Sequence, residues 1–215
     1  MRFICFTGID GSGKSTLARW LVSYMKSQGV DSRYVYSRYR LLLSKPFMSV
    51  ARSLFLHGEH PFKDYNRYVS VRQSAFENGF FSSAYKYVML LDYIIQALVK
   101  VRILLMLRKN IVVDRYVYDT VITDFALDAA YSDKQIKKLI DRLFLILPKP
   151  DIVFLVDVSA EIAYRRKTDV PSISYPSRRR PLYLNLAKRP EVKTIDGSKS
   201  IEELRCTVID VLLQH

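Results

Sequence analysis

The sequence predicts an α/β fold in which a five-stranded parallel sheet has helices on both of its faces. Short and almost continuously apolar segments alternate with segments of helical spacing, as is typical of parallel sheets whose strands are buried. A glycine-rich loop follows the first apolar segment and opens a helix. The 215 residues contain no low-complexity tract or linker. We therefore expect one domain over residues 1–215.

The first half of the chain should contain two strands and at least two helices. The run RFICFT is apolar and ends at Gly8, and KSTLARWLVSYMKSQG has helical spacing with Gly29 as a stop signal. SRYVYSR predicts the second strand. The region at about 41–81 is interrupted by two prolines and is interpreted as helical. A long helix is expected at about 83–109.

The second half continues the alternation of strands and helices. NIVVDR predicts the third strand and is followed by helical stretches at about 118–130 and 133–147. DIVFLVDV predicts the fourth strand, with AEIAYRR as the next helix. The segment YPSRRRPLYLNLAKR should be mostly helical after Pro181. VKTID is the last strand, and SIEELRCTVIDVLLQ is a helix that Ser200 and Glu203 cap.

Several observations predict a cytoplasmic protein without a membrane span. MRFICF runs directly into a strand, so neither a signal nor a transit peptide is expected. The two cysteines lie outside any CxxC or Cys/His cluster and are predicted to be buried in a reducing compartment. The most hydrophobic segment, YVMLLDYIIQALVKVRILLML, carries four polar residues that are spaced as the solvent side of an amphipathic helix. These residues are Asp92, Gln96, Lys100 and Arg102.

The net charge of +13 allows two interpretations. A basic surface can bind the phosphate backbone of a nucleic acid. A site that handles phosphates also concentrates lysine and arginine, and the remaining basic residues are scattered along the chain. We therefore predict small-molecule nucleotides as partners, and no nucleic acid.

The segment GIDGSGKST matches the phosphate-loop pattern GxxxxGK[ST] between a predicted strand and a predicted helix. From average residue frequencies, such a match arises by chance about once in a hundred chains of this length. Glycines let backbone N–H groups converge on a phosphate, and the helix N-terminus adds positive potential. The predicted ATP-binding residues are Gly8, Gly11, Ser12, Gly13, Lys14, Ser15 and Thr16.

Asp114 and Arg115 end the third predicted strand and are candidates for a metal and a phosphate. A phosphate loop needs a carboxylate that helps its serine, here Ser15, to hold Mg²⁺. The alternative is that Asp114 only caps the following turn. In a parallel sheet both residues would emerge at the carboxyl edge, beside the phosphate loop, where ligands bind.

A polar segment flanked by arginines predicts a short lid at about residues 165–180. It contains TDVPSISYPS between the cluster Arg165–Lys167 and the cluster Arg178–Arg180. Half or more of these cations could simply be solvated. A closing lid, however, needs donors that reach a transferring phosphoryl group and exclude water.

Taken together, the motifs resemble the thymidylate kinase family of P-loop nucleoside monophosphate kinases. They are GIDGSGKST, VVDRYVYD, VFLVDV, the short lid, RRRPLYLNLA and TIDGSKSIEEL, and they follow the family's order over nearly the whole chain. The resemblance implies a P-loop NTPase fold and transfer of the ATP γ-phosphoryl group to a nucleoside 5′-monophosphate, with dTMP giving dTDP. It also implies Mg²⁺ as cofactor and a homodimer formed through the long helix.

The resemblance also implies individual roles. Lys14, Ser15 and Thr16 would bind the ATP phosphates and the metal, Asp114 would bind the metal, and Arg115 would bind the acceptor phosphate. The remaining candidate substrate residues are Asp10 for the sugar hydroxyl, Arg38 and Tyr39 after the second strand, and Asp119 near the base.

The sequence departs from the family pattern in ways that affect catalysis and base recognition. In one branch an arginine follows the loop acid, but here that position is Gly11, so the lid must supply the catalytic arginine. Arg166 and Arg179 are the favoured candidates. Ile94 stands near the position where the family has an arginine toward the base. At Asp119 the family commonly has a small polar residue, and a carboxylate there would prefer a base with an N–H donor.

Three alternative functions are compatible with these motifs. A deoxynucleoside kinase shares the architecture but phosphorylates an uncharged 5′-hydroxyl and needs a general base. A kinase for another pyrimidine monophosphate would use the same loop. A regulatory protein could use the phosphate loop as a switch, although such a protein has no need for a lid that shields an acceptor.

Overall fold

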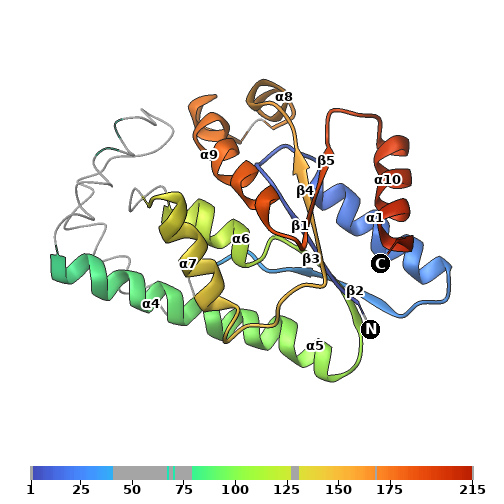
Figure 1. Ribbon diagram of the computed structural model, residues 1–215, viewed down its shortest axis with the longest axis horizontal. Coiled ribbons are helices and arrows are strands. Elements are labelled where there is room, and N and C mark those ends of the chain that lie inside the picture. The colour runs from blue at the N-terminus through green and yellow to red at the C-terminus, as the bar shows by residue number, and fades with distance from the viewer. Residues whose placement is uncertain are drawn as a thin grey trace.

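The computed structural model describes residues 2–40, 67, 70, 79–126, 131–167 and 169–214 (Figure 1). The helical interpretation of residues 41–81 lies almost entirely outside these ranges, as does the end of the stretch predicted at 118–130. All five predicted strands are present and run parallel, in the order β2-β3-β1-β4-β5. They are β1 Phe3–Thr7, β2 Ser32–Tyr36, β3 Asn110–Asp114, β4 Ile152–Asp157 and β5 Val192–Asp196. The predicted α/β fold is therefore confirmed.

Helices connect the strands and cover both faces of the sheet (Figure 1). The helical elements are α1 Lys14–Ser27, α4 Gly79–Ala97, the π-helix η1 Leu98–Arg102, α5 Ile103–Met106, α6 Val117–Thr120, the π-helix η2 Val121–Ala126, α7 Asp133–Leu143, α8 Ala160–Arg165, α9 Ser174–Leu184, the 3₁₀-helix η3 Asn185–Lys188 and α10 Ile201–Leu213. None of the described helices is long and apolar enough to cross a membrane.

Two apolar clusters, one on each face, hold these layers together. On one face, Leu17 and Leu21 of α1 and Val208 of α10 pack on strand residues such as Phe154. On the other face, α4, α6, α7 and α9 pack against the alternate residues of the same strands. Because successive strand residues point to opposite faces, the apolar runs seen in the sequence supply both clusters. Each fully buried side chain of this size contributes about 1.5–3 kcal/mol.

The central position of β1 determines where a ligand can bind. β1 lies between β3 and β4, and Phe6 of β1 is the register partner of Asp114. Strands β3 and β2 lie on one side of β1, and strands β4 and β5 lie on the other, so the strand order reverses at β1 and creates a crevice at the carboxyl edge. The phosphate loop and the end of β3 both lie at this edge.

The long helix predicted at about 83–109 forms as α4, η1 and α5. Of its four polar residues predicted to face solvent, Arg102 is exposed and Lys100 is half-buried, but the prediction is wrong for the other two. Asp92 and Gln96 are buried, whereas Leu91, Ile95 and Val99 are exposed. The Gln96 side-chain amide donates hydrogen bonds to Asp92 Oδ1 at 2.9 Å and to a backbone carbonyl at 2.6 Å. Hydrogen bonding makes burial of these polar groups tolerable, which spacing alone cannot reveal.

Two further details near the C-terminus differ from the sequence-based expectation. Helix α9 begins at Ser174, before Pro181, and it contains that proline in its interior. The turn residues of the expected lid are therefore partly helical. Cys206 is exposed, although it was predicted to be buried, while Cys5 is buried. The capping box of Ser200 and Glu203 is confirmed at the start of α10.

Candidate functional site

The phosphate loop lies between β1 and α1, and its glycines have conformations that other residues rarely adopt. Gly11 and Gly13 have φ angles of 88° and 93°. A Cβ atom on Gly11 would come within 2.2 Å of the Ala163 carbonyl oxygen in α8. A side chain at position 11 is thus excluded by both backbone strain and close packing. The structure consequently agrees with a loop that carries no arginine after Asp10.

Lys14 begins α1 and is buried within the loop, with 3% of its surface exposed. Its Nζ donates a hydrogen bond to the Ile9 carbonyl at 2.9 Å and lies 3.8 Å from Asp10 Oδ1. Burial lowers the pKa of Lys14, while the carboxylates of Asp119 and Asp114 oppose this shift. The lysine is held in place by loop oxygens that the oxygens of a bound phosphate could replace.

Arg115 turns back from the end of β3 toward the phosphate loop and forms an ion pair with Asp10. Its backbone is in the left-handed region, with a φ of 65°. Such a conformation costs about 1 kcal/mol or more in a residue with a side chain. The Arg115 N–H donates to the Phe6 carbonyl at 3.1 Å, which fixes this turn against β1. The strained turn therefore places the guanidinium beside the loop.

Asp119 lies in α6, next to Arg115, and both of its carboxylate oxygens accept hydrogen bonds from the protein. Thr7 Oγ1 donates to Oδ2 at 2.8 Å, and the Tyr183 hydroxyl donates to Oδ1 at 3.0 Å. Arg115 Nη1 lies 3.9 Å from Oδ1. Burial raises the pKa of Asp119, while Arg115 counters this effect. The structure thus places Asp119 beside Arg115 as a buried hydrogen-bond acceptor.

Asp114 is fully buried at the end of β3, and the geometry of its carboxylate fits a metal ligand. The Tyr34 hydroxyl donates to Oδ2 at 2.7 Å, and Oδ1 has no hydrogen-bond partner among the described residues. Within the same ranges, no three His, Cys, Asp or Glu residues gather to hold a metal alone. Magnesium does not need such a cage, because it keeps several waters and uses one or two protein ligands beside substrate phosphates.

The lid arginines have different environments. Arg166 donates to the Gly197 carbonyl at 2.9 Å. Arg180 makes two 2.8 Å hydrogen bonds to Asp157 at the end of β4. Arg165 and Arg178 are exposed. Arg179 is buried.

Arg179 contacts a tyrosine that reaches the phosphate loop. Its guanidinium carbon lies 3.6 Å from the centre of the Tyr175 ring. The hydroxyl of Tyr175 in turn donates to Asp10 Oδ2 at 3.2 Å. Tyr175 therefore links α9 to the loop acid, and it brings Arg179 to the same end of the sheet.

Arg38 and Tyr39 follow β2, where the sequence predicted them to approach an acceptor. Arg38 Nη2 lies 3.9 Å from Asp124 Oδ1 of η2. Tyr39 packs against the apolar cluster that contains Met89 and Phe125. Both residues thus lie between β2 and the elements that cover the second face of the sheet. π-Helices such as η2 are rare and are frequently found at functional sites.

The family comparison agrees with this arrangement. A family model described as thymidylate kinase matches residues 69–208, which is well over half of the chain. The chain belongs to the thymidylate kinase family. Its matches include a probable thymidylate kinase of Sulfurisphaera tokodaii, with 23% identity over 98% of this chain and 95% of the relative. A thymidylate kinase of Leptospira interrogans is 24% identical over 99% of this chain and 94% of the relative.

A third relative, a probable thymidylate kinase of Methanocaldococcus jannaschii, is 27% identical over 98% of this chain and 95% of its own length. These matches cover the region before residue 69 that the family model leaves out. The thymidylate kinase relationship thus extends over nearly the whole chain.

Sequence reasoning missed two tyrosines at this thymidylate kinase site. Tyr34 is an ordinary strand-forming residue by its position in β2, and nothing in the local sequence relates it to Asp114. Tyr175 lies within the polar lid segment, where an aromatic residue among turn formers was the available signal. Both contacts depend on tertiary structure, because they join residues 80 and 165 positions apart.

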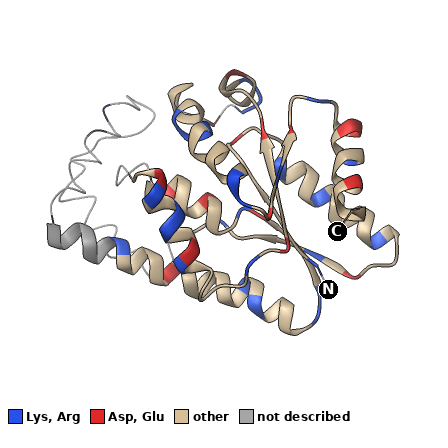
Figure 2. Ribbon diagram, in the orientation of Figure 1, with Lys and Arg blue, Asp and Glu red and all other residues tan. Residues whose placement is uncertain are grey.

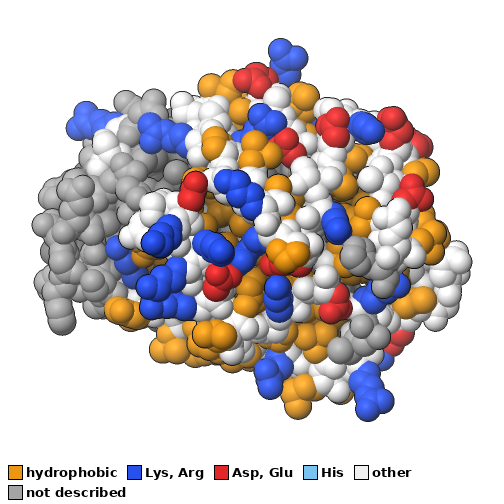
Figure 3. Space-filling view, viewed as in Figure 1, with side chains coloured by type: hydrophobic (Ala, Val, Ile, Leu, Met, Phe, Trp, Pro, Cys, Tyr) orange, Lys and Arg blue, Asp and Glu red, His pale blue; other side chains and the backbone are white. Residues whose placement is uncertain are grey.

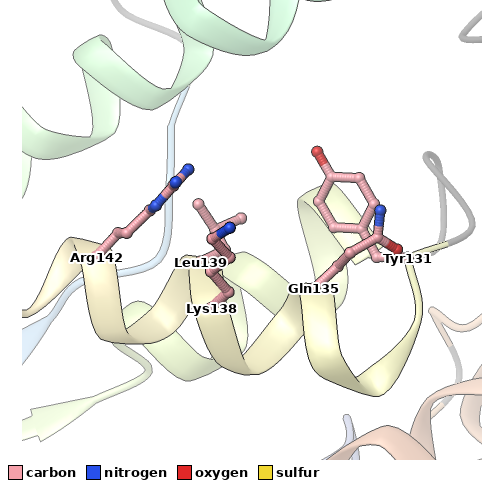
Figure 4. Close-up of a pocket in the computed structure, with 5 residues that line it drawn as sticks. All are labelled: Tyr131, Gln135, Lys138, Leu139 and Arg142. Atoms are coloured by element: carbon pink, nitrogen blue, oxygen red, sulfur yellow. The ribbon is translucent and has the colours of Figure 1, made fainter.

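Basic residues elsewhere in the structure lie on many elements rather than on one (Figure 2). A separate pocket of about 200 Å³ lies along α7. Its lining side chains come from α7 or the segment just before it and point to one side of that helix (Figure 4). They are Tyr131, Gln135, Lys138, Leu139 and Arg142. None of the predicted site residues lines this pocket.

Proposed function

We propose that the protein transfers the γ-phosphoryl group of ATP to a deoxynucleoside 5′-monophosphate, with dTMP giving dTDP. The observation that carries the proposal is the ion pair between Arg115 and Asp10. It joins the end of β3, where the acceptor phosphate would bind, to the loop that would bind the donor. The names of the relatives support thymidylate as the acceptor.

On this proposal, the phosphate loop holds the donor. Backbone N–H groups from Gly8 to Thr16 surround the β-phosphate, with Gly11, Ser12 and Gly13 at the turn of the loop. Lys14 exchanges the Ile9 carbonyl for oxygens of the β- and γ-phosphates. Ser15 and Asp114 would hold Mg²⁺, which would neutralise charge on the donor phosphates.

The acceptor would lie on the other side of the transferred group. Arg115 and Arg38 bind its 5′-phosphate, and Asp10 accepts a hydrogen bond from its sugar hydroxyl. Asp119 acts through Arg115, and Tyr39 packs near the acceptor. An acceptor phosphate oxygen then attacks the γ-phosphorus while the bond to the β–γ bridging oxygen breaks, and ADP leaves. A monophosphate is already ionised, so no general base is required.

The lid at about residues 165–180 would supply the catalytic arginine. The contact of Arg179 with Tyr175 favours Arg179, because Tyr175 reaches the loop acid. Arg166 is the second candidate, and it would first have to leave the Gly197 carbonyl. A guanidinium placed at the γ-phosphoryl group stabilises the charge that develops during transfer.

We also propose a homodimer formed through the long helix. The exposed side chains of α4, η1 and α5 include Leu91, Ile95, Val99 and Ile103, which repeat every four residues. Hydrophobic side chains gather over these helices along one edge of the molecule (Figure 3). The polar Asp92 and Gln96 are buried, so the exposed stripe is apolar and can pack against a second copy of the chain.

The free thiols Cys5 and Cys206 support a cytoplasmic location.

A coupled assay of ADP release tests the proposed activity. It compares dTMP, dUMP, UMP, dCMP and thymidine as acceptors, with the Lys14→Ala variant as the control for the loop. We expect turnover with dTMP and none with Lys14→Ala. Turnover of thymidine without turnover of any monophosphate would contradict the proposal, and turnover by Lys14→Ala would remove the loop lysine from the mechanism.

A further inference from the structure

The two oxygens of the Asp114 carboxylate differ in their surroundings. Oδ2 accepts a 2.7 Å hydrogen bond from the Tyr34 hydroxyl. Oδ1 is buried and has no hydrogen-bond partner in the part of the chain that the structure describes. A buried carboxylate oxygen without a partner is costly unless a ligand completes its environment. One oxygen is therefore fixed by the protein and the other is left for a ligand.

The strand register orients this carboxylate toward the phosphate loop. Tyr34 and Val112 are register partners, and both belong to the apolar cluster beneath α1. Asp114 follows Val112 by two residues, so it points to the same face of the sheet. Ser15 lies in the first turn of α1 on this face. Asp114 and the loop serine thus approach the site from the same side.

Tyr34 is itself held between the sheet and α1. The guanidinium carbon of Arg19 lies 5.3 Å from the centre of the Tyr34 ring. Arg19 is one helical turn after Ser15. A ring that is confined by α1 on one side and hydrogen-bonded to Asp114 on the other has little freedom to rotate. Its hydroxyl can therefore fix the orientation of the carboxylate.

We propose that Tyr34 is a positioning residue, which fixes Oδ2 of Asp114 so that Oδ1 faces the magnesium ion bound with the donor nucleotide. The inference rests on the proposed metal role of Asp114. Groups that hydrogen-bond to a metal ligand orient it, and their loss typically reduces metal affinity by about 10–100-fold. Tyr34 makes no contact with the reacting atoms in this scheme and acts only through Asp114.

The test uses the full chain and measures Mn²⁺ binding in the presence of saturating ADP by electron paramagnetic resonance. Tyr34→Phe removes only the hydroxyl, and we expect about tenfold weaker Mn²⁺ binding. The affinity for ADP in EDTA should stay at the wild-type value, because the loop itself is unchanged. Tyr24→Phe is the matched control, since Tyr24 stacks on Trp20 within α1 and should leave both affinities unchanged.

The Asp114→Asn variant distinguishes the metal role of Asp114 from the positioning role of Tyr34. If Asp114→Asn binds Mn²⁺ like the wild type, the proposed metal role of Asp114 fails. If only Tyr34→Phe does so, the positioning role alone is overturned. The double variant should bind Mn²⁺ no more weakly than Asp114→Asn, whereas independent, multiplied losses would contradict action through Asp114. A similar loss of metal-free ADP binding in Tyr34→Phe would indicate general damage and would also overturn the inference.

Discussion

Arg115 and Asp10 form a buried ion pair although they are 105 residues apart in the sequence. The pair connects the turn after β3 with the phosphate loop after β1. In the proposed reaction the two side chains bind different parts of the same acceptor, its phosphate and its sugar hydroxyl. The contact therefore arranges the acceptor site before a ligand is bound, which lowers the cost of ordering it.

Asp10→Ala should weaken dTMP binding much more than ATP binding. The carboxylate contacts Arg115 and Tyr175, while donor phosphates are bound mainly by backbone groups of the loop. We expect about a tenfold increase in the Kd for dTMP, corresponding to a charged hydrogen bond of about 1.5 kcal/mol. Calorimetric titration with each nucleotide measures this, with the exposed Asp210→Ala as control. An equal loss for both nucleotides would contradict the role of Asp10.

Arg179→Ala should lower kcat by about a hundredfold or more, because it removes a donor that stabilises transition-state charge. The KM values for both nucleotides should change less. Arg178→Ala is the matched control, since it removes a neighbouring but exposed arginine. Steady-state kinetics of both variants give the kcat and KM values that test this expectation. If Arg166→Ala abolishes turnover and Arg179→Ala does not, the catalytic arginine is Arg166.

Leu91→Glu and Val99→Glu should convert a dimer into a monomer. Both side chains are more than half exposed in the single chain and lie on the stripe of the long helix. A charge at the centre of an apolar interface would have to be buried without a partner. Light scattering should give about twice the chain mass of 25.1 kDa for the wild type and the single mass for the variants. A monomeric wild type would refute the proposed assembly.

Only one of the two cysteines should react with a thiol reagent in the folded protein. Burial, together with Asp119 and Asp114, raises the pKa of the Cys5 thiol well above its usual value, so its reactive thiolate is suppressed. Cys206 is exposed on α10. Titration with a chromogenic disulfide reagent at pH 8 should give one fast thiol per chain, and two in denaturant. Fast modification of both in the folded state would contradict this packing.

The hydroxyl of Tyr34 should make stability depend on alkaline pH. Burial and the neighbouring Asp114 carboxylate raise the pKa of Tyr34 to about 12, whereas an unfolded tyrosine titrates at about 10. The fold therefore favours the neutral phenol. Its contribution is fully present below about pH 10 and is lost as the pH rises toward about 12.

Urea unfolding of the wild type and Tyr34→Phe at pH 9 and pH 11 measures this contribution. The stability of the wild type relative to Tyr34→Phe should decrease at the higher pH. The other tyrosines titrate in both proteins, so their effects cancel in the comparison. A difference that stays constant between the two pH values would show that the pKa of Tyr34 is not raised.

Local sequence determined the central strands, the phosphate loop and the cap of the last helix. Apolar runs such as NIVVD predicted the three central strands, because a strand buried on both faces needs little else. The phosphate loop was predictable as well, since glycines at fixed positions are required by its positive φ angles. The cap of Ser200 on α10 followed from residues only three positions apart.

Only the tertiary structure decided the contacts between distant elements and the faces that remain exposed. Asp92 and Gln96 were predicted to face solvent, but they lie buried because their hydrogen-bond partners come from each other and from a segment after β2. Tyr34 meets Asp114 because β2 pairs with β3, and Tyr175 meets Asp10 because α9 packs over the loop. Sequence periodicity records which residues share a face of one element, whereas the partner of that face is set by how the elements pack together.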